Sequence, residues 1–446
     1  MKLEIPRDVE AIIHILEEAG YEAYAVGGCV RDAILGREPN DWDITTSAMP
    51  EEVKALFSYT IDTGIEHGTV TIMMHKIGYE VTTYRIDGKY SDHRHPEEVT
   101  FTRSLEEDLK RRDFTINAMA YNERSGLVDL FGGQSDLKEG VIRAVGLPRE
   151  RFSEDALRMM RAVRFAAQLG FSIEPETAEA VKALAPTIKD ISAERIQVEL
   201  VKLLESDHPE RMRTLYELGI TAVIMPEFDR MMETEQHNPH HMYTVGEHSI
   251  RATQAIRADK VLRLAMLFHD IAKPITKTTD EAGIDHFHGH PQKSAEMAHT
   301  IMRRLKFDNA STDLVARLCR YHDRNIEPNP RAMRRALHEM GEDLFPVLFT
   351  VKQADMEAQS TYKREEKQKL LDEMEACYLE VIKAGDPVNL GALCVKGKDL
   401  MEWGMKPGPQ LGVMLKALLD EVIEDPARNT KEELKKLYEA KKSEIL

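Results

Sequence analysis

Apolar residues recur every three or four positions along most of this chain, which is the spacing of helices with one buried face. The first such segment, residues 7–19, predicts a helix that ends at Gly20 and buries Val9, Ile12, Ile13 and Leu16. The short apolar run 24–26 follows and predicts a strand that leads directly into two adjacent glycines, Gly27 and Gly28.

A different pattern, in which apolar or β-branched residues alternate with polar ones, occupies residues 69–74 and 79–84. It predicts two strands that form a hairpin with its turn at residues 76–78. A helix that begins at Pro50 precedes them, since proline is favoured in the first helical turn. Residues 1–140 are therefore predicted to form a small sheet flanked by helices. Helical patterns separated by prolines follow almost to the end of the chain.

The composition is that of a soluble protein, because 42% of the 446 residues are hydrophobic and 31% are charged. This length predicts about three domains. No apolar run reaches the roughly 20 residues that cross a bilayer, and the first residues lack the apolar core of a signal peptide. We therefore expect a cytoplasmic protein without a membrane partner. Its four cysteines form no CxxC pair and are expected to be reduced.

The formal net charge of −17 argues against a protein that coats nucleic acid generally, because non-specific affinity comes mainly from neutralised phosphates. A negative net charge is still compatible with a local basic surface. If the chain binds RNA, we expect it to recognise a shaped RNA end.

The segment 26–45 carries the first candidate chemistry. Because they have no Cβ, Gly27 and Gly28 let backbone N–H groups approach an anion closely, and a helix that starts there would add a favourable field for phosphate. Asp41 and Asp43 follow at i and i+2, a spacing that puts both carboxylates on one face of a strand. Paired carboxylates of this kind suit Mg²⁺. A phosphate cradle followed by paired acids indicates a metal-dependent phosphoryl or nucleotidyl transferase.

Either feature alone is more often structural, since an isolated Asp-x-Asp is usually a turn or a solvated edge. Together, GGCVRDAILG at residues 27–36 and DWDI at residues 41–44 resemble the head-domain motif of the tRNA nucleotidyltransferase and bacterial poly(A) polymerase family. This family is a branch of the superfamily that includes DNA polymerase beta. The resemblance implies an α+β fold, in which a small polymerase-beta-like sheet domain precedes all-α neck, HD and tail domains. It also implies that Arg31 belongs to the nucleotide-binding residues.

The resemblance makes Glu80, on the strand expected beside the two aspartates, a candidate third catalytic acid. That Glu80 is only an exposed acid on a strand is an equally good interpretation. Residues 85–109 are polar and long for a connection, which is typical of functional or disordered loops. They resemble the flexible loop that family members need in order to add the terminal adenosine. Relatives that add only the two cytidines look shortened here, so this loop argues against a CC-only enzyme.

RRDFTINA, at residues 111–118, matches a second motif of the family. Arg111 and Arg112 can hold a triphosphate in bidentate fashion. Asp113 can accept a hydrogen bond from a ribose hydroxyl, which would favour ribonucleotides. Asn117 is expected to hold the Asp113 carboxylate in place. An Arg-Arg-Asp run on its own would more often start a surface helix.

The segment EDALRMMRAVRFAAQLGF, residues 154–171, predicts a helix with a buried face of Leu157, Met160, Val163 and Ala167. Asp155 and Arg158, at i and i+3, share another face of this helix. They could form a simple surface salt pair, or they could bind a base. An accepting carboxylate and a donating guanidinium fit the amino group and ring acceptor of cytosine or adenine and mismatch uracil and guanine. In the family, EDxxR is the amino-acid template of CCA-adding enzymes, and it also occurs in the poly(A) polymerase branch. Arg161 and Arg164 join the predicted nucleotide-binding residues. Further on, Arg195 and Glu199 are i, i+4 partners that are expected to brace helices.

Histidines gather between residues 237 and 323, and His and Asp side chains that converge from several helices can hold one or two divalent metals. Their order resembles the HD phosphohydrolase domain. The resemblance implies a mononuclear ligand set of His248, His269, Asp270 and Asp355, with His290 and His322 as extra ligands for a second metal. Lys273 is a candidate phosphate contact. The other histidines of this region are expected to be loop or surface residues: His237, His240, His241, His286 and His288.

These patterns predict four parts: a nucleotidyltransferase head over residues 1–140, a neck with the nucleotide-selecting motif over 141–225, an HD domain over 226–362 and an RNA-binding tail over 363–446. The predicted function is Mg²⁺-dependent addition of CCA to the 3′ end of tRNA from CTP and ATP. An HD phosphohydrolase activity, with a divalent metal of open identity, is an optional addition. Three alternatives remain: an A-adding enzyme or poly(A) polymerase, an HD phosphohydrolase with an inactive head, and a non-catalytic RNA-binding protein. The oligomeric state is left open.

Overall fold

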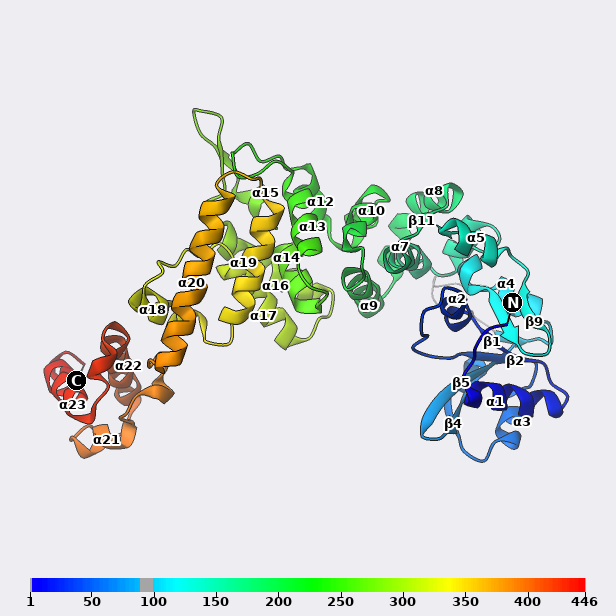
Figure 1. The fold of residues 1–446 in the computed structure, drawn as a ribbon, viewed down its shortest axis with the longest axis horizontal. Helices are drawn as coiled ribbons and strands as arrows, with labels where there is room; N and C mark the ends of the chain where they lie inside the picture. Colours follow the sequence, from blue (N-terminus) through cyan, green and yellow to red (C-terminus); the bar gives the residue numbers. More distant parts are fainter. Residues whose placement is uncertain (1, 89–98, 446) are drawn as a thin grey trace. The chain divides into compact units, whose positions relative to one another are not determined.

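The computed structural model describes residues 2–88 and 99–445 of the chain. They form two units that we describe separately, Met1–Asp229 with Arg304–Lys306 and Arg230–Arg303 with Phe307–Leu446. The first unit holds a mixed sheet and helices, and the second is almost entirely helical (Figure 1). The predicted α+β fold is therefore confirmed, whereas the finer division into head, neck, HD and tail parts stays a prediction.

A seven-stranded mixed sheet forms the core of the first part of the chain. Its strands are β1 (Ala23–Val26), β2 (Ile44–Thr46), β3 (Thr60–Gly64), β4 (Thr69–Met74), β5 (Ile77–Thr83), β8 (Met119–Asn122) and β9 (Gly126–Asp129). The strand order is β3–β4–β5–β2–β1–β8–β9, in which β2 and β5 run parallel and the other neighbours are antiparallel. The predicted hairpin is confirmed as β4–β5. Its turn lies at His75 and Lys76, whose φ angles of 48° and 70° suit a tight two-residue turn.

Five helices pack with this sheet: α1 (Arg7–Glu18), α2 (Gly28–Ile34), α3 (Pro50–Leu56), α4 (Leu105–Lys110) and α5 (Gly133–Glu139). The predicted helix at the start of the chain is confirmed as α1, and it buries the four apolar residues that predicted it. The helix predicted to begin at Pro50 is confirmed as α3.

The segment predicted as a long loop, residues 85–109, contains secondary structure at both ends. β6 (Arg85–Asp87) pairs antiparallel with β7 (Val99–Phe101), and α4 begins at Leu105 with the side chain of Ser104 as its N-cap. Residues 89–98, the centre of the predicted loop, lie outside the described residues.

The rest of the first unit is helical, apart from a two-residue parallel ladder between β10 (Val141–Ile142) and β11 (Ser172–Ile173). Its helices are α6 (Pro148–Glu154), α7 (Leu157–Leu169), α8 (Pro175–Leu184), α9 (Ala193–Leu204), α10 (Met212–Glu217) and α11 (Thr221–Ile224). The next helix, α12 (Pro226–Glu233), spans the boundary between the two units. The predicted apolar face of α7 is buried as expected.

The second unit consists of helices and one short antiparallel ladder between β12 (Thr278–Thr279) and β13 (Asp285–His286). The helices are α13 (Val245–Ala255), α14 (Lys260–Phe268), α15 (Lys273–Thr276), α16 (His290–Arg304), α17 (Asn309–Tyr321), α18 (Pro330–Met340), α19 (Phe345–Ala358), α20 (Arg364–Ala384), α21 (Gly397–Glu402), α22 (Pro409–Glu424) and α23 (Lys431–Ile445). The last three share a separate hydrophobic cluster that includes Leu400, Leu418 and Tyr438. Among the helices described, none combines the length and the apolar character needed to cross a membrane.

Candidate functional site

The first candidate site lies where β2 and β5 run side by side. The sequence predicts Asp41 and Asp43 on a strand, but β2 begins one residue after Asp43, so both acids belong to the extended segment before it. In the parallel pair, Ile44 lies opposite Val81, and the preceding residues, Asp43 and Glu80, are therefore neighbours as well. Glu80 on β5 is thus a third acid beside Asp41 and Asp43.

The charges of the three carboxylates act on one another. Burial by surrounding atoms raises the pKa of Asp43, and the charges of Glu80 and Asp41 raise it further, against the lowering effect of Arg112. All three acids line one depression in the first unit and remain accessible to solvent. Acids that repel one another at an accessible place fit a divalent cation with oxygen ligands, so these residues suit Mg²⁺.

The glycine turn makes room for an arginine beside these acids. Gly27 has a φ of +84°, and α2 starts directly after it. A Cβ at Gly27 would lie 2.9 Å from Nη1 of Arg112, so a larger side chain would displace this guanidinium. The prediction that backbone N–H groups of the turn face an anion needs a correction for Gly27, because its N–H donates to the carbonyl of Met119 (3.1 Å).

Arg111 and Arg112, the predicted triphosphate-binding residues, share one buried carboxylate. Asp108 accepts hydrogen bonds from Nε and Nη2 of Arg111 (3.0 and 2.8 Å) and lies 3.6 Å from Nη2 of Arg112. Nε of Arg112 has no hydrogen-bond partner among the described residues. Burial alone would raise the pKa of Asp108, but the two arginines hold it below its usual value. Sequence reasoning missed Asp108, although its i, i+3 and i, i+4 spacing to the arginines is a usable signal.

A hydrogen-bond network joins four of the other predicted nucleotide-binding residues. Nη1 of Arg31 donates to Oδ1 of Asn117 (2.8 Å), and Nδ2 of Asn117 donates to Oδ1 of Asp113 (3.1 Å). Nε of Arg161 donates to Oδ2 of Asp113 (2.8 Å). Burial would raise the pKa of Asp113, but the charge of Arg161 holds it well below its usual range. Asp113 therefore links the head to α7, and its contact with a ribose stays a prediction.

Asp155 and Arg158 do not share one helix, contrary to the sequence expectation. Asp155 occupies the junction between α6 and α7, where it accepts hydrogen bonds from the backbone N–H two residues further on (3.0 Å) and from Nη2 of Arg195 (2.7 Å). Arg158 lies in the first turn of α7, where Nη1 donates to Glu154 (2.6 Å) and Nη2 to the carbonyl of Arg111 (3.1 Å). Arg158 therefore contacts the backbone of Arg111, a predicted triphosphate residue, whereas Asp155 is held by Arg195.

Arg164, the last predicted nucleotide-binding arginine, points into the protein. It is 6% exposed, its guanidinium lies 3.6 Å from the ring centre of Phe165, and Nε donates to Glu199 (2.8 Å). Arg195 and Glu199 connect helices as expected, but not as a pair, because Arg195 binds Asp155 instead. In this structure Arg164 stabilises the contact between α7 and α9.

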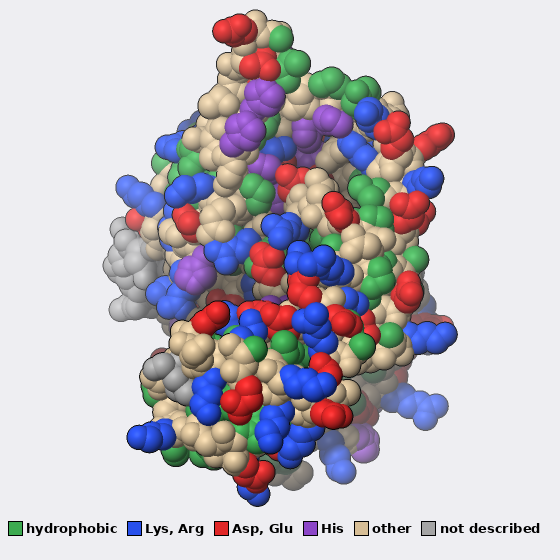
Figure 2. Space-filling view, turned by 90° about the vertical axis from the view of Figure 1, so that its left-hand side faces the viewer, with side chains coloured by type: hydrophobic (Ala, Val, Ile, Leu, Met, Phe, Trp, Pro, Cys, Tyr) green, Lys and Arg blue, Asp and Glu red, His purple; other side chains and the backbone are tan. Residues whose placement is uncertain are grey.

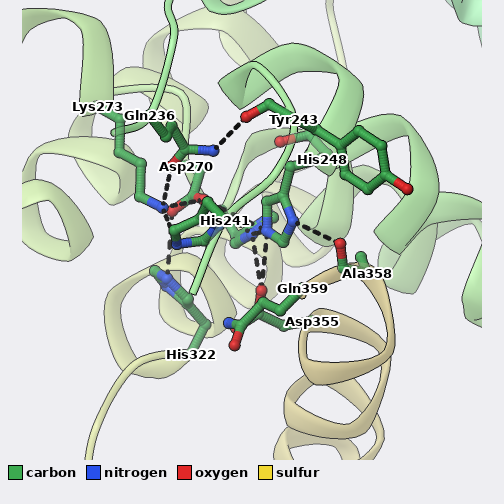
Figure 3. Close-up of polar contacts among 12 residues, drawn as sticks. Gln236, His241, Tyr243, His248, Asp270, Lys273, His322, Asp355, Ala358 and Gln359 are labelled. Atoms are coloured by element: carbon green, nitrogen blue, oxygen red, sulfur yellow. Dashed lines mark hydrogen bonds and ion pairs between the residues drawn. The ribbon is translucent and has the colours of Figure 1, made fainter. Parts of the chain in front are cut away.

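The second candidate site is a buried cluster in the second unit, which brings together the six residues predicted as ligands. Figure 3 labels His248, Asp270, His322 and Asp355 among them. Their helices are α13 (His248), the end of α14 (His269 and Asp270), α16 (His290), the end of α17 (His322) and α19 (Asp355). Nε2 of His248 lies 3.1 Å from Nε2 of His269 and 2.9 Å from Oδ1 of Asp355. Oδ1 of Asp270 lies 3.2 Å from Nε2 of His290 and 3.6 Å from Nε2 of His322. Asp270 thus stands between two sets of ligands.

Backbone carbonyls orient all four histidines of this cluster. Nδ1 of each ring is within hydrogen-bond distance of a carbonyl: 3.3 Å for His248, 2.7 Å for His269, 2.7 Å for His290 and 2.7 Å for His322. Since a carbonyl only accepts, Nδ1 carries the proton and Nε2 faces the cluster as a potential ligand. Burial would lower the pKa of His269, but Asp270 and Asp355 raise it to about 10. Nε2 of His269 is therefore protonated as well, unless a cation replaces that proton. The donor set fits one or two divalent cations.

Lysines and a neutral histidine line the pocket of about 820 Å³ that opens beside this cluster. Nζ of Lys273 lies 2.7 Å from Oδ2 of Asp270. His241, expected in a loop or at the surface, lies in the loop before α13 and lines the pocket, with Nε2 3.4 Å from Nζ of Lys273. Burial together with the Lys273 charge lowers the pKa of His241 to about 2. Lys352, one turn before Asp355 on α19, also lines the pocket and was missed, although its spacing to Asp355 is visible in the sequence. Figure 2 shows a face on which histidines gather beside Lys and Arg side chains.

Family models match three consecutive parts of the chain. The "Poly A polymerase head domain" model matches residues 23–143, an "RNA and SrmB- binding site of polymerase A" model matches residues 170–232, and a "tRNA nucleotidyltransferase domain 2" model matches residues 277–437. These matches follow the order of the motifs found in the sequence.

Curated relatives and solved structures match nearly the whole chain. The CCA-adding enzyme of Levilactobacillus brevis is 38% identical over 97% of this chain and 98% of the relative, and that of Lactobacillus helveticus is 36% identical over 96% and 95%. The structure of the Bacillus stearothermophilus CCA-adding enzyme in complex with CTP is 32% identical, with a TM-score of 0.74 and 99% of both chains covered. The Thermotoga maritima CCA-adding enzyme complexed with tRNA, 18% identical with a TM-score of 0.61, covers 99% of this chain and 100% of its own and shares the fold.

Proposed function

This chain belongs to the family of CCA-adding enzymes, and from this membership we propose how its two candidate sites work. It is a tRNA nucleotidyltransferase that adds CCA to the 3′ end of tRNA from CTP and ATP without a nucleic-acid template. In each step the RNA 3′-hydroxyl attacks the α-phosphate of the nucleotide and pyrophosphate leaves. We expect this reaction to take place in the cytoplasm.

The group of three carboxylates carries the assignment of the first site. Asp41, Asp43 and Glu80 would hold Mg²⁺, which when bound makes the hydroxyl a better nucleophile and stabilises the leaving pyrophosphate. Burial raises the pKa of Asp43, and the charges of Glu80 and Asp41 raise it further, which supports this assignment. Arg112 lies beside the glycine turn with Nε unpartnered among the described residues, and we assign it to the triphosphate.

Asp155 and Arg158 keep enough hydrogen-bonding capacity to select the base. A guanidinium has five N–H donors, and the hydrogen bonds of Arg158 to the described residues use three of them, two at Nη1 and one at Nη2. A carboxylate has about four lone-pair positions, of which Asp155 uses two. Nε–H and one Nη2–H of Arg158, together with a free lone pair of Asp155, can therefore meet the amino group and ring nitrogen of cytosine or adenine.

Stepwise extension of tRNA that lacks its 3′ end tests this function. The tRNA is incubated with CTP alone, ATP alone or both, and the products are sequenced. We expect two cytidines with CTP alone and CCA with both nucleotides. No incorporation of CTP would favour the A-adding or poly(A) polymerase alternative. Incorporation that persists in Asp41→Ala would remove the acids from the mechanism.

For the second site we propose a metal-dependent phosphohydrolase activity. Four histidines whose Nε2 atoms are directed at Asp270 and Asp355 support a resident metal centre, and Lys273, His241 and Lys352 make the adjoining pocket suited to a phosphate. The ligands would hold one or two divalent cations, which when bound supply a hydroxide nucleophile at neutral pH. The substrates that fit this chemistry are 2′,3′-cyclic phosphates and terminal phosphates of RNA.

Two measurements test this second site. Elemental analysis of the purified protein identifies the bound metal and its stoichiometry, and hydrolysis of 2′,3′-cyclic AMP is followed with each divalent metal in turn. We expect at least one tightly bound metal and a metal-dependent rate that Asp270→Asn abolishes. A protein that binds metal but hydrolyses neither cyclic nor terminal phosphates would leave the centre with a structural role only.

A further inference from the structure

Asp108 is a fully buried carboxylate that touches several parts of the head at once. Its side chain is 0% exposed. Oδ1 accepts hydrogen bonds from Nε and Nη2 of Arg111 (3.0 and 2.8 Å) and from the backbone N–H of Arg85 (3.4 Å). Oδ2 accepts from Oγ1 of Thr45 (3.0 Å) and lies 3.6 Å from Nη2 of Arg112. One side chain thus joins α4 with β2 and with the start of β6.

These contacts connect the acid site with the arginine that faces the glycine turn. Thr45 lies on β2 two residues after Asp43, so Asp108 is bonded to the strand that directly follows Asp41 and Asp43. Arg112 approaches Gly27 so closely that a Cβ there would lie 2.9 Å from Nη1. Asp108 therefore contacts both β2, which directly follows the two aspartates, and the guanidinium predicted to bind the triphosphate.

The two arginines depend on Asp108 in different ways. Arg111 meets it with two donors at hydrogen-bond distance, the geometry of a fixed tether. Arg112 meets it as an ion pair at 3.6 Å and has an unpartnered Nε among the described residues. Without the charge of Asp108, the two guanidinium groups would repel each other, and Arg112 would move toward the remaining carboxylates, of which Asp43 is close enough to interact with it.

We propose that Asp108 is a positioning residue for nucleotidyl transfer, which holds Arg112 at a fixed place relative to Asp43 so that the triphosphate and the metal ligands are aligned. Arg111 then acts as the tether of Asp108 rather than as a ligand of the triphosphate. Because CTP and ATP carry the same triphosphate, the positioning effect is equal for both nucleotides. Asp155 and Arg158, which we assign to the base, are not among the hydrogen-bond partners of the Asp108 carboxylate.

The variant Asp108→Asn in the full-length protein tests this proposal, because it keeps the shape of the side chain and removes its charge. We expect kcat for single-nucleotide incorporation to fall about 100-fold with CTP and with ATP alike, the loss typical of reacting groups displaced by about 1 Å. Discrimination against UTP should not change. In EDTA, without turnover, CTP should bind about tenfold more weakly by calorimetry, as one charge-assisted contact becomes misaligned. Replacement of Arg112 by Met should weaken this binding more than replacement of Arg111 by Met.

A matched control is Glu174→Gln, which removes a carboxylate charge of the same unit away from the acids. Glu174 caps α8 by accepting from the N–H of Thr177 (2.7 Å) and lies 3.4 Å from Arg143. We expect its kcat and CTP binding to match the unmodified protein. An equal loss in this variant would show a general structural effect and overturn the proposal.

Thermal unfolding checks that the variants fold. If Asp108→Asn does not, Thr45→Val keeps the charge of Asp108 and removes the hydrogen bond to Oδ2, together with the contact of Oγ1 with the carbonyl of Thr82 (3.2 Å). We expect a loss of about fivefold in kcat, equal for both nucleotides. Unchanged kcat in a folded Asp108→Asn protein, or a loss confined to one nucleotide, would overturn the proposal. Stronger dependence on Arg111 than on Arg112 for CTP binding in EDTA would overturn the assignment of the tether.

Discussion

The two candidate metal sites of this protein are built in opposite ways. The acids Asp41, Asp43 and Glu80 come from two adjacent parts of one sheet and remain accessible to solvent. The ligands of the second site come from five helices, and Asp270 at its centre is 1% exposed. Backbone carbonyls fix each histidine of the second site, whereas the acids of the first repel one another.

This difference follows from what each site has to admit. An open group of acids lets an RNA end and a nucleotide with its metal enter and leave, and the repulsion is relieved only while the cation is present. A buried set of oriented ligands is organised before the metal binds, so it holds a resident cation tightly. The first site is therefore suited to exchange and the second to retention.

Removing an acid of the open site should give the largest effect. We expect Asp43→Ala to lower CTP incorporation on the order of 1000-fold, because the stabilisation that a catalytic metal provides amounts to several kcal/mol. The metal content of the second unit should not change. Single-turnover extension of tRNA and elemental analysis of the same preparation measure both quantities. A loss of resident metal in this variant would contradict the independence of the two sites.

The converse experiment removes a ligand of the closed site. His269→Ala should weaken metal binding by more than about 100-fold, since even indirect partners of a metal ligand contribute 10- to 100-fold, and CTP incorporation should stay as in the unmodified protein. Competition with a chelating dye measures the metal affinity. His299→Ala, an exposed histidine on α16, is the control and should bind metal normally. Retained affinity in His269→Ala would exclude His269 as a ligand.

The sequence predicted most of what depends on local spacing. The helix at residues 7–19 and the β4–β5 hairpin follow from apolar periodicity, because one face of each is buried. The ligands of the second site could be named in order because the succession of His and Asp residues resembles that of the HD phosphohydrolase domain. Helix ends were less predictable: Asp155 accepts from the N–H of Leu157 and so interrupts a pattern that reads as one helix.

Contacts between distant segments could not be predicted from spacing alone. The bond between Asp108 and Thr45 spans 63 residues, and only the folded sheet brings these groups together. His241 was expected in a loop or at the surface and does lie in a loop, but nothing around it in the sequence shows that this loop folds beside Lys273. The partner of Arg195 was missed for the same reason, because Asp155 lies 40 residues away.

A change in the base-selecting residues of the open site should have an intermediate effect, on the choice of nucleotide. Arg158→Lys replaces a fork of donors by a single charge, and we expect CTP and ATP incorporation to fall about 10- to 30-fold relative to UTP, since a buried polar site discriminates by pairing its own groups. Ratios of kcat/KM for the three nucleotides measure this change. Arg164→Lys, on the same helix but directed into the protein, is the comparison and should leave the ratios as they are. Equal ratios in both variants would remove Arg158 from base selection.

The smallest expected effect concerns stability and carries the opposite sign to the effect on activity. The pKa of Asp43 is raised in the folded protein, so the charged form is favoured less there than in the unfolded chain, and stability falls as the pH rises through this pKa. Asp43→Asn should therefore raise the melting temperature of the first unit at pH 8 in EDTA, by about 1–2 °C because solvent screens an accessible carboxylate. At a pH where the carboxylate is protonated the gain should vanish, and Mg²⁺ should stabilise only the unmodified protein. A lower melting temperature for Asp43→Asn at pH 8 would mean that the charge of Asp43 does not destabilise the folded protein.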